Sequence, residues 1–144
     1  MGFHPKWVQW VIQCISTVNF SVVVNGEARV QINLGRGLRQ GDPLSPYLFA
    51  LVKDVLSKMI STAQGGNNFS GIQLNRHCPK LSHIFFADDA SLFLKAEIQN
   101  CATVEQMLGK YGQASGHRIN FNKSSVSFSS TMGEIDKQLV CDLF

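Results

Sequence analysis

Two adjacent carboxylates, Asp88 and Asp89, lie between two apolar runs of the 144-residue sequence. The runs 81–86 and 90–95 have the length and composition of short strands, so the pair is expected at the tip of a β-hairpin. Like charges at a tight turn repel each other, and a divalent cation such as Mg²⁺ or Mn²⁺ would remove that cost because it prefers oxygen ligands. The pair is therefore a candidate metal site, although aspartate also simply closes many turns.

A basic, glycine-rich loop precedes the longest helical pattern of the chain. It reads Arg-Gly-Leu-Arg-Gln-Gly-Asp-Pro-Leu-Ser-Pro over residues 36–46. Glycine lets the backbone of such a loop approach a ligand, and arginines near a helix N-terminus suit phosphate or paired bases. Asp42-Pro43 predicts the start of that helix. The alternative is an ordinary loop before a capped helix.

A third polar segment, residues 115–124, ends in Lys123-Ser124 after a predicted helix stop at Gly116. A lysine here is able to meet a phosphate or to deliver a proton. The alternative is a solvated lysine in a turn, which is where most lysines lie.

The elements that must position these residues follow from hydrophobic periodicity. The long helix, 42 to about 61 or 63, carries the apolar stripe Leu44, Leu48, Leu51, Val52, Val55, Met59 and Ile60, and is expected to bury Leu48, Leu51, Val52 and Val55 against a sheet. The other expected elements are helices 5–15, 102–114 and 134–143, strands 18–24 and 28–34 joined at Asn25-Gly26, and short strands 71–74, 119–121 and 126–128. The predicted fold class is α+β, a mainly antiparallel sheet with helices packed on one face.

The composition is sufficient for a hydrophobic core but does not identify a binding partner. Hydrophobic residues make up 44% of the chain and charged residues 16%, with a formal net charge of +3, which is compatible with a polyanionic partner without requiring one. No apolar run approaches the roughly 20 residues of a membrane span, and no signal peptide is evident. The four scattered cysteines are typical of reduced thiols. We expect an intracellular protein, in the nucleus or cytoplasm and not secreted.

The three segments occur together in the order and with the separations of the reverse transcriptase palm. Residues 36–46 resemble the motif that contacts template and incoming nucleotide, Phe86-Ala87-Asp88-Asp89 resembles the metal-binding hairpin, and 116–124 is similar to the following lysine motif. The string at 36–46 points to non-LTR, LINE-type retrotransposons. The resemblance covers residues 1–129 as a partial palm, with 130–144 as a C-terminal segment that begins the connection to a thumb.

The resemblance implies a role for each matching residue in RNA-directed DNA synthesis, with an RNA template, a DNA primer and a deoxynucleoside triphosphate as partners. Asp88 would be a principal ligand of Mg²⁺ or Mn²⁺ and Asp89 a secondary one. Lys123 would give a proton to pyrophosphate. The loop residues Arg39, Gln40 and Gly41 would lie against the template–nucleotide pair, and Phe86 would pack near the primer end.

The family's first catalytic carboxylate belongs to a strand upstream of the segment that begins here at Met1, and none of Asp54, Asp136 and Asp142 takes its place. The fingers and the thumb also fall outside these residues. We therefore expect the isolated chain to be inactive and the metal to bind only when the upstream carboxylate is present. Two other interpretations stay open: a non-enzymatic retrotransposon relic with weak nucleic-acid binding, and an unrelated metal hydrolase, which leaves the 36–46 string unexplained.

Overall fold

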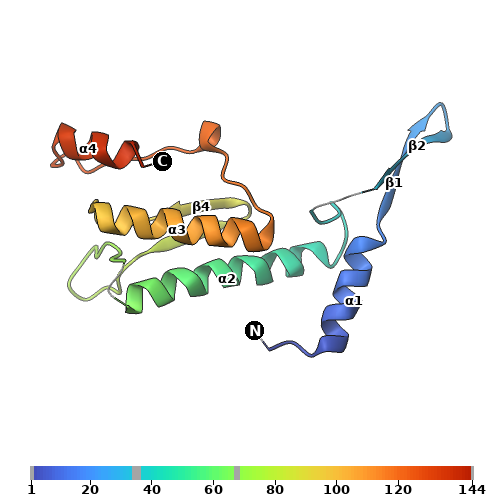
Figure 1. Ribbon diagram of the computed structural model, residues 1–144, viewed down its shortest axis with the longest axis horizontal. Helices are drawn as coiled ribbons and strands as arrows, with labels where there is room; N and C mark the ends of the chain where they lie inside the picture. The colour runs from blue at the N-terminus through green and yellow to red at the C-terminus, as the bar shows by residue number, and fades with distance from the viewer. Residues whose placement is uncertain (1, 34–36, 67–68, 144) are drawn as a thin grey trace. The chain divides into compact units, whose positions relative to one another are not determined.

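The computed structural model describes residues 2–33, 37–66 and 69–143. The chain divides into two compact units, Met1–Phe49 and Ala50–Phe144 (Figure 1). Both contain helices and antiparallel strand pairs, so the predicted α+β class is confirmed. The strands form separate two-stranded sheets, β1–β2 and β3–β4, among the described residues, where one larger sheet was expected.

The first unit opens with helix α1 (Pro5–Ser16), within one residue of the predicted range. Pro5 occupies the first turn, where no backbone N–H is needed, and the imidazole of His4 accepts a hydrogen bond from the backbone N–H of Lys6 at 3.2 Å. These local features explain why the helix begins where the sequence predicted.

Strands β1 (Asn19–Val24) and β2 (Glu27–Asn33) follow as an antiparallel hairpin. Asn25 and Gly26, the two turn residues, have φ values of 52° and 83°. Positive φ at both central positions is the pattern of a type I′ turn, whose twist matches that of the strands. The hairpin prediction is confirmed, and a bulge between Val22 and Val23 shifts the register near the turn.

Helix α2 (Ser45–Gly65) begins three residues later and ends later than predicted. Asp42 does not cap the helix itself: its Oδ1 accepts from the backbone N–H of Leu44 at 2.7 Å, which forms a separate turn ahead of the helix. Pro46 then lies in the first helical turn, where its missing N–H costs nothing. Pro43 and Pro46 each favour a helix start. The helix begins beside Pro46, because the hydrogen bond between Asp42 and Leu44 forms a separate turn at Pro43.

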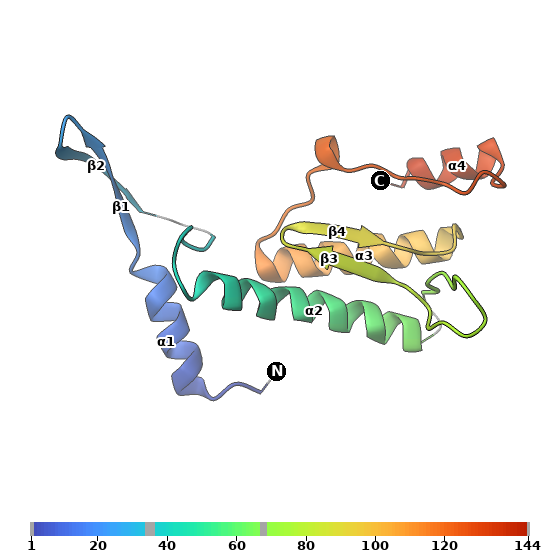
Figure 2. The same ribbon diagram turned by 180° about the vertical axis from the view of Figure 1, so that it is seen from behind.

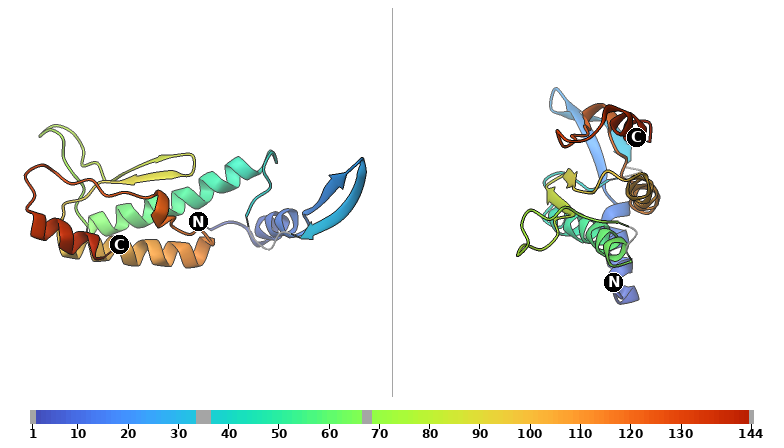
Figure 3. Two further views of the ribbon diagram at one scale, coloured as in Figure 1. Left: turned by 90° about the horizontal axis from the view of Figure 1, so that it is seen from above. Right: turned by 90° about the vertical axis from the view of Figure 1, so that its left-hand side faces the viewer.

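The core of the second unit lies between α2, helix α3 (Ile98–Ser115) and the hairpin of β3 (His83–Phe86) and β4 (Asp89–Leu92). The two helices run antiparallel, and the hairpin lies along them (Figures 2 and 3). Phe85 and Leu92 contribute to the core from the hairpin side. The buried cluster consists of Leu56, Ile60, Phe69, Val104, Met107 and Tyr111.

The apolar stripe of α2 is rotated from the predicted one. Leu56 is only 2% exposed and was not part of the predicted stripe, whereas Val55 is 39% exposed and Leu44 lies on the surface. Val52 packs against the core as predicted. The prediction for Val55 is wrong because α2 faces α3 as well as the hairpin, so its buried face is centred between the two neighbours rather than on one sheet.

Three predicted strands are absent from the described residues. Residues 71–74 form a single bridge, Ile72 with Leu81, and 119–121 and 126–128 are not strands. Instead, a short 3₁₀ turn covers Phe121–Lys123. A strand exists only where a partner strand satisfies its backbone, and three-residue apolar alternation does not specify one.

Helix α3 begins at Ile98, four residues before the predicted start at 102, and ends as predicted at Gly116, whose φ of 75° closes the last turn. The terminal helix α4 (Glu134–Cys141) is confirmed and buries Val140. Within the described ranges, no helix has both the length and the apolarity needed to cross a membrane.

The neighbouring residues Leu56 and Val55 offer a test of this packing. Leu56→Ala is expected to lower the free energy of unfolding by about 2–4 kcal/mol, because it removes a buried side chain and leaves a cavity. Val55→Ala is the matched control, with an expected change below about 1 kcal/mol because the side chain is largely exposed. Urea unfolding of the purified chain measures both. Equal losses, or a larger loss for Val55, would contradict the observed helix orientation.

Candidate functional site

The two carboxylates lie at the tip of the β3–β4 hairpin, as predicted. Phe86 pairs with Asp89, which makes Ala87 and Asp88 the two residues of the turn and Asp89 the first residue of β4. Ala87 has a φ of 48°, in the left-handed region that disfavours a side chain. Positive φ at the first turn residue alone is the pattern of a type II′ turn, where glycine is usual. The strained residue Ala87 is therefore adjacent to Asp88.

The hairpin has a covered face and an open face. Phe85 on β3 turns toward the core, while its neighbours Ile84 and Phe86 turn away and are exposed, Phe86 by 79%. Because paired residues of a hairpin share a face, Asp89 lies on the open face with Phe86. Both Asp88 and Asp89 are exposed. The tip thus presents two carboxylates beside an exposed aromatic ring.

Helix α2 contacts the tip through Lys53. The Lys53 Nζ donates to the backbone oxygen of Asp88 at 3.2 Å and lies 5.0 Å from the centre of the Phe85 ring. Burial lowers the pKa of Lys53, and the negative charges of Asp88 and Asp89 act in the opposite direction. One ammonium group is therefore close enough to both carboxylates to interact with their charge.

One helical turn further along α2, Ser57 holds the base of the hairpin. Its Oγ is 2.9 Å from Nε2 of His83, and the Oγ of Ser82 is 3.0 Å from Nδ1 of the same ring. The ring also lies tilted against Phe85, with 4.8 Å between centroids. Burial lowers the pKa of His83. This half-buried histidine has a partner for each nitrogen and connects the helix to the strand.

The carboxylate pair suits a hard divalent cation by ligand type, and its exposure leaves the oxygens accessible. Within the ranges that the structure describes, no group of three or more histidine, cysteine or acidic side chains is placed to hold a metal ion. Asp88 and Asp89 therefore fit as part of a metal site, to which further oxygen ligands would have to be added.

The loop of Arg39, Gln40 and Gly41 belongs to the first unit and is also exposed. The backbone N–H of Asp42 donates to the Arg39 oxygen at 3.3 Å, which closes a turn with Gln40 and Gly41 at its corner. Gly41 has a φ of 82°, as the second corner residue of a type II turn requires. A Cβ at Gly41 would meet nothing within 4 Å, so the glycine is needed for its conformation and the space beside it is open.

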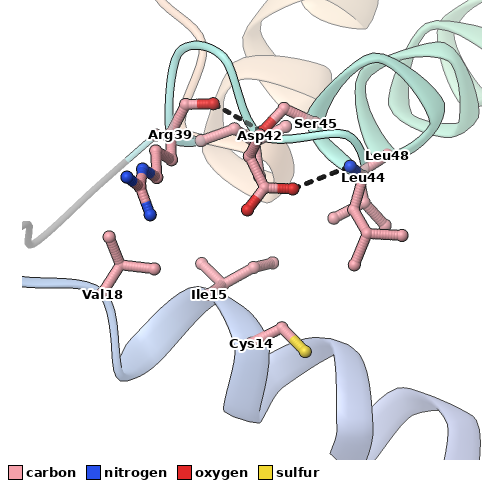
Figure 4. Close-up of a pocket in the computed structure, with 10 residues that line it drawn as sticks. Cys14, Ile15, Val18, Arg39, Asp42, Leu44, Ser45 and Leu48 are labelled. Atoms are coloured by element: carbon pink, nitrogen blue, oxygen red, sulfur yellow. Dashed lines mark hydrogen bonds between the residues drawn. The ribbon is translucent and has the colours of Figure 1, made fainter.

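Side-chain hydrogen bonds make this turn rigid (Figure 4). The Ser45 Oγ donates to the Arg39 oxygen at 2.7 Å, and the Arg39 guanidinium lies 5.8 Å from the Phe20 ring on β1. The cavity beneath the loop, which Cys14 and Leu48 help to line, measures about 20 Å³. That volume holds about one water molecule, which leaves no room for a larger ligand inside the cavity. Arg36 lies outside the described residues.

Lys123 ends the 3₁₀ turn, and its backbone N–H donates to the Asn120 oxygen at 3.0 Å. In the part of the chain that the structure describes, it forms no hydrogen bond or ion pair with Asp88 or Asp89. The preceding loop is tied to α3 by a 3.0 Å contact between the Tyr111 hydroxyl and Nδ1 of His117. The resemblance also predicts that Gln40–Gly41 and Asp88 face a common cleft, because one primer–template end must touch both. The loop and Asp88 belong to different units, so the cleft stays a prediction.

Sequence reasoning missed Lys53, Ser57 and His83, which contact the hairpin from inside the fold. One signal was present: Lys53 and Ser57 are four residues apart, so they share one side of α2 next to its apolar stripe. Nothing in the sequence showed that this side would meet the carboxylate hairpin.

A carboxylate-tipped antiparallel hairpin packed on two helices makes the second unit an α+β framework that presents two exposed carboxylates. The family described as Reverse transcriptase (RNA-dependent DNA polymerase) matches residues 1–137, and the chain belongs to it. The match extends past residue 129, where the resemblance was expected to end, into α4.

The relatives come from plants and animals. Over 69 residues the chain is 45% identical to an uncharacterized mitochondrial protein of Arabidopsis thaliana, covering 48% of this chain and 57% of that protein. It is 32% identical over 97 residues to the Retrovirus-related Pol polyprotein from type-1 retrotransposable element R2 of Popillia japonica (67% and 15%). It is 25% identical over 124 residues to the Transposon TX1 uncharacterized 149 kDa protein of Xenopus laevis (86% and 9%).

The chain therefore spans between 9% and 57% of the length of these relatives. No solved structure matches it. The predicted identity, a reverse transcriptase domain segment of the non-LTR, LINE-type branch, is confirmed by the family and by these transposon proteins.

The strained turn residue makes a prediction. Ala87→Gly is expected to raise the free energy of unfolding by up to about 1 kcal/mol, because glycine adopts positive φ without the Cβ clash. Ala90→Gly, in the adjacent strand, is the matched control and is expected to lower it by about 0.5–1 kcal/mol. Urea unfolding of the chain measures both changes, and destabilisation by Ala87→Gly would be incompatible with the observed turn.

His83 predicts a pH dependence of stability. Its pKa is lower in the folded chain than the value near 6.5 expected after unfolding, so the unfolded state binds more protons between the two values. The stabilising contribution is complete above pH 6.5 and is lost as the pH falls toward the folded pKa. Urea unfolding between pH 7.5 and 5 should show this loss, and His83→Gln should reduce it. His77→Gln, at an exposed position of the same unit, is the control; an equal effect of both substitutions would exclude His83 as the cause.

Proposed function

We propose that this chain is the palm segment of an RNA-directed DNA polymerase and that Asp88 and Asp89 bind Mg²⁺ or Mn²⁺ for nucleotidyl transfer. The observation that carries the proposal is the exposed carboxylate pair at the end of a hairpin braced by α2, in a chain that belongs to the reverse transcriptase family. A site on a rigid element holds its ligands more accurately than one on a loop, which suits a reaction that depends on alignment.

The carboxylate oxygens of Asp88 and Asp89 are the groups that would hold the cation. When bound, divalent metal supplies Lewis acidity that favours attack by a primer hydroxyl and stabilises departing pyrophosphate. Phe86 shares the open face of the hairpin with Asp89 and offers an aromatic surface to the primer end. Lys123, which is exposed, is the proposed proton donor to pyrophosphate.

The Arg39–Gly41 turn is the proposed surface for the template and the nucleotide. Its corner residues Gln40 and Gly41 are exposed, and the open space at Gly41 permits close approach of a planar base pair. The Arg39 side chain provides a cation for phosphate. The hydrogen bonds that fix the turn limit the entropy lost on binding, which favours affinity.

The same proposal assigns RNA template, DNA primer and deoxynucleoside triphosphate as partners of the whole polymerase, whose fingers and thumb would complete the binding surface. Residues 1–129 would belong to the palm, and 130–144, with α4, would begin the connection to the thumb. The polymerase would work inside the cell, in the nucleus or cytoplasm.

Primer extension tests the assigned residues in a polymerase that carries this segment behind the family's upstream carboxylate strand. Asp88→Asn should reduce extension by about 100-fold or more, because an amide is a poor ligand for a hard cation. Lys123→Ala should slow extension by roughly tenfold without preventing nucleotide binding, as expected for lost proton transfer. Asp136→Asn, at an exposed position on α4, is the control and should retain activity.

The outcomes separate the proposals. Full activity of Asp88→Asn would exclude the metal role, and a Lys123→Ala effect confined to nucleotide affinity would exclude the proton-donor role. We expect the 144-residue chain alone to extend no primer. Templated synthesis by that chain, lost in Asp88→Asn, would show that expectation to be wrong, whereas weak nucleic-acid binding without synthesis in the completed polymerase would favour a non-enzymatic relic.

A further inference from the structure

The tip of the carboxylate hairpin is tied to α2 across 35 residues of sequence by the Lys53 ammonium. The group bonds to the main-chain oxygen of Asp88 at 3.2 Å, and it stands over the Phe85 ring. Four residues later, Ser57 contacts His83 at the base of the same hairpin. Besides the apolar packing, helix α2 therefore forms a polar contact with the hairpin at each end.

The hairpin needs such a brace for physical reasons. Each of its strands has four residues, and a two-stranded hairpin of that length is at best marginally stable alone. Its turn contains a residue with positive φ, and two like charges follow one another at its end. Both features favour loosening of the tip, where a metal ligand must be held in one direction.

The acceptor of the Lys53 hydrogen bond is a main-chain oxygen, and this matters for metal binding. Lys53 donates to the backbone oxygen of Asp88, and this hydrogen bond restrains the turn itself without occupying a carboxylate oxygen. Its ammonium charge also offsets part of the repulsion between the two carboxylates. A hydrogen bond to a carboxylate would instead occupy an oxygen that a cation needs.

We propose that Lys53 is a positioning residue for the carboxylate pair: it anchors the Ala87–Asp88 turn to α2 and so holds Asp88 and Asp89 in the direction needed to bind a divalent cation. This inference rests on the proposed role of Asp88 and Asp89 as metal ligands. It gives α2, the helix that follows the Arg39–Gly41 turn, a function in the metal site. Lys53 belongs neither to the carboxylate motif nor to the loop motif.

Two effects of Lys53 on metal binding have opposite signs, which makes the proposal testable. As a nearby positive charge, Lys53 repels a divalent cation, so removing the charge would strengthen binding. As an anchor, Lys53 reduces the freedom of the ligands, so its removal would weaken binding. The proposal requires that the second effect exceed the first.

The experiment uses a polymerase that carries this segment behind the family's upstream carboxylate strand. It titrates this polymerase with Mn²⁺ and follows paramagnetic broadening of the amide signals of Asp88, Asp89 and Ala90. Lys53→Met, which keeps an unbranched side chain one atom shorter and removes its charge and donor, should weaken Mn²⁺ binding by roughly tenfold, as loss of an outer partner of a ligand does. Lys53→Arg should restore binding to within about twofold. Lys58→Met, at an exposed position of the same helix, is the matched control and should not change it.

A second measurement, amide hydrogen exchange at 87–89, tests the anchor without metal. Lys53→Met should speed exchange there and leave α3 unchanged, and Lys53→Arg should not. Should Lys53→Met fail to fold, Lys53→Gln, whose amide ends one bond short, is measured with the same expectation. Tighter or unchanged Mn²⁺ binding in the variant, or unchanged exchange at the tip, would overturn the proposal.

Different results would disprove the metal site and the anchoring role of Lys53. Asp88→Asn should abolish the Mn²⁺ broadening seen in the unsubstituted polymerase, which tests the metal site and not the anchor. Absence of broadening in the unsubstituted polymerase would count against Asp88 and Asp89 as metal ligands and against the positioning role in metal binding. Faster exchange of the tip in Lys53→Met would then still support the anchoring contact.

Discussion

Burial of one face of α2 between α3 and the β3–β4 hairpin is the constraint on which the second unit depends. Leu56 and Ile60 from α2, with Val104, Met107 and Tyr111 from α3, form most of the buried cluster, and Phe85 joins it from the hairpin. A four-residue hairpin has too little surface to be stable by itself. Its position therefore follows from the helices that support it, and so does the position of the carboxylates at its tip.

The second determinant is electrostatic. The tip places Asp88 and Asp89 side by side after a residue with positive φ, an arrangement that costs stability unless something opposes it. Lys53 supplies an opposing charge and a bond to the turn, and His83 with Ser57 holds the opposite end. Strain and like charge near a functional group are typical of sites where a ligand completes the arrangement.

In the first unit, by contrast, the conformation of the candidate binding loop depends on local contacts. The Arg39–Asp42 turn is closed by its own backbone, by Ser45 Oγ and by the conformation of Gly41, all within seven residues. Such a turn is specified almost entirely by its local sequence. This explains why the sequence of residues 36–46 was informative without a structure. The geometry of the carboxylate pair, by contrast, depends on the helices that support its hairpin.

The sequence by itself determined the α+β class, the Asn25-Gly26 hairpin, the placement of Asp88 and Asp89 at a hairpin tip, the end of α3 at Gly116 and the family. Each of these depends on residues within a few positions of one another, or on the order of motifs. The tertiary structure alone decided that Leu56 and not Val55 is buried, that residues 119–121 and 126–128 are not strands, and that Lys53 and Ser57 contact the hairpin. The Lys53 and Ser57 contacts join residues that are 35 and 26 positions apart, and the burial of Leu56 likewise depends on which distant surfaces meet. A helix with several apolar and polar sides does not specify its neighbours from its own residues.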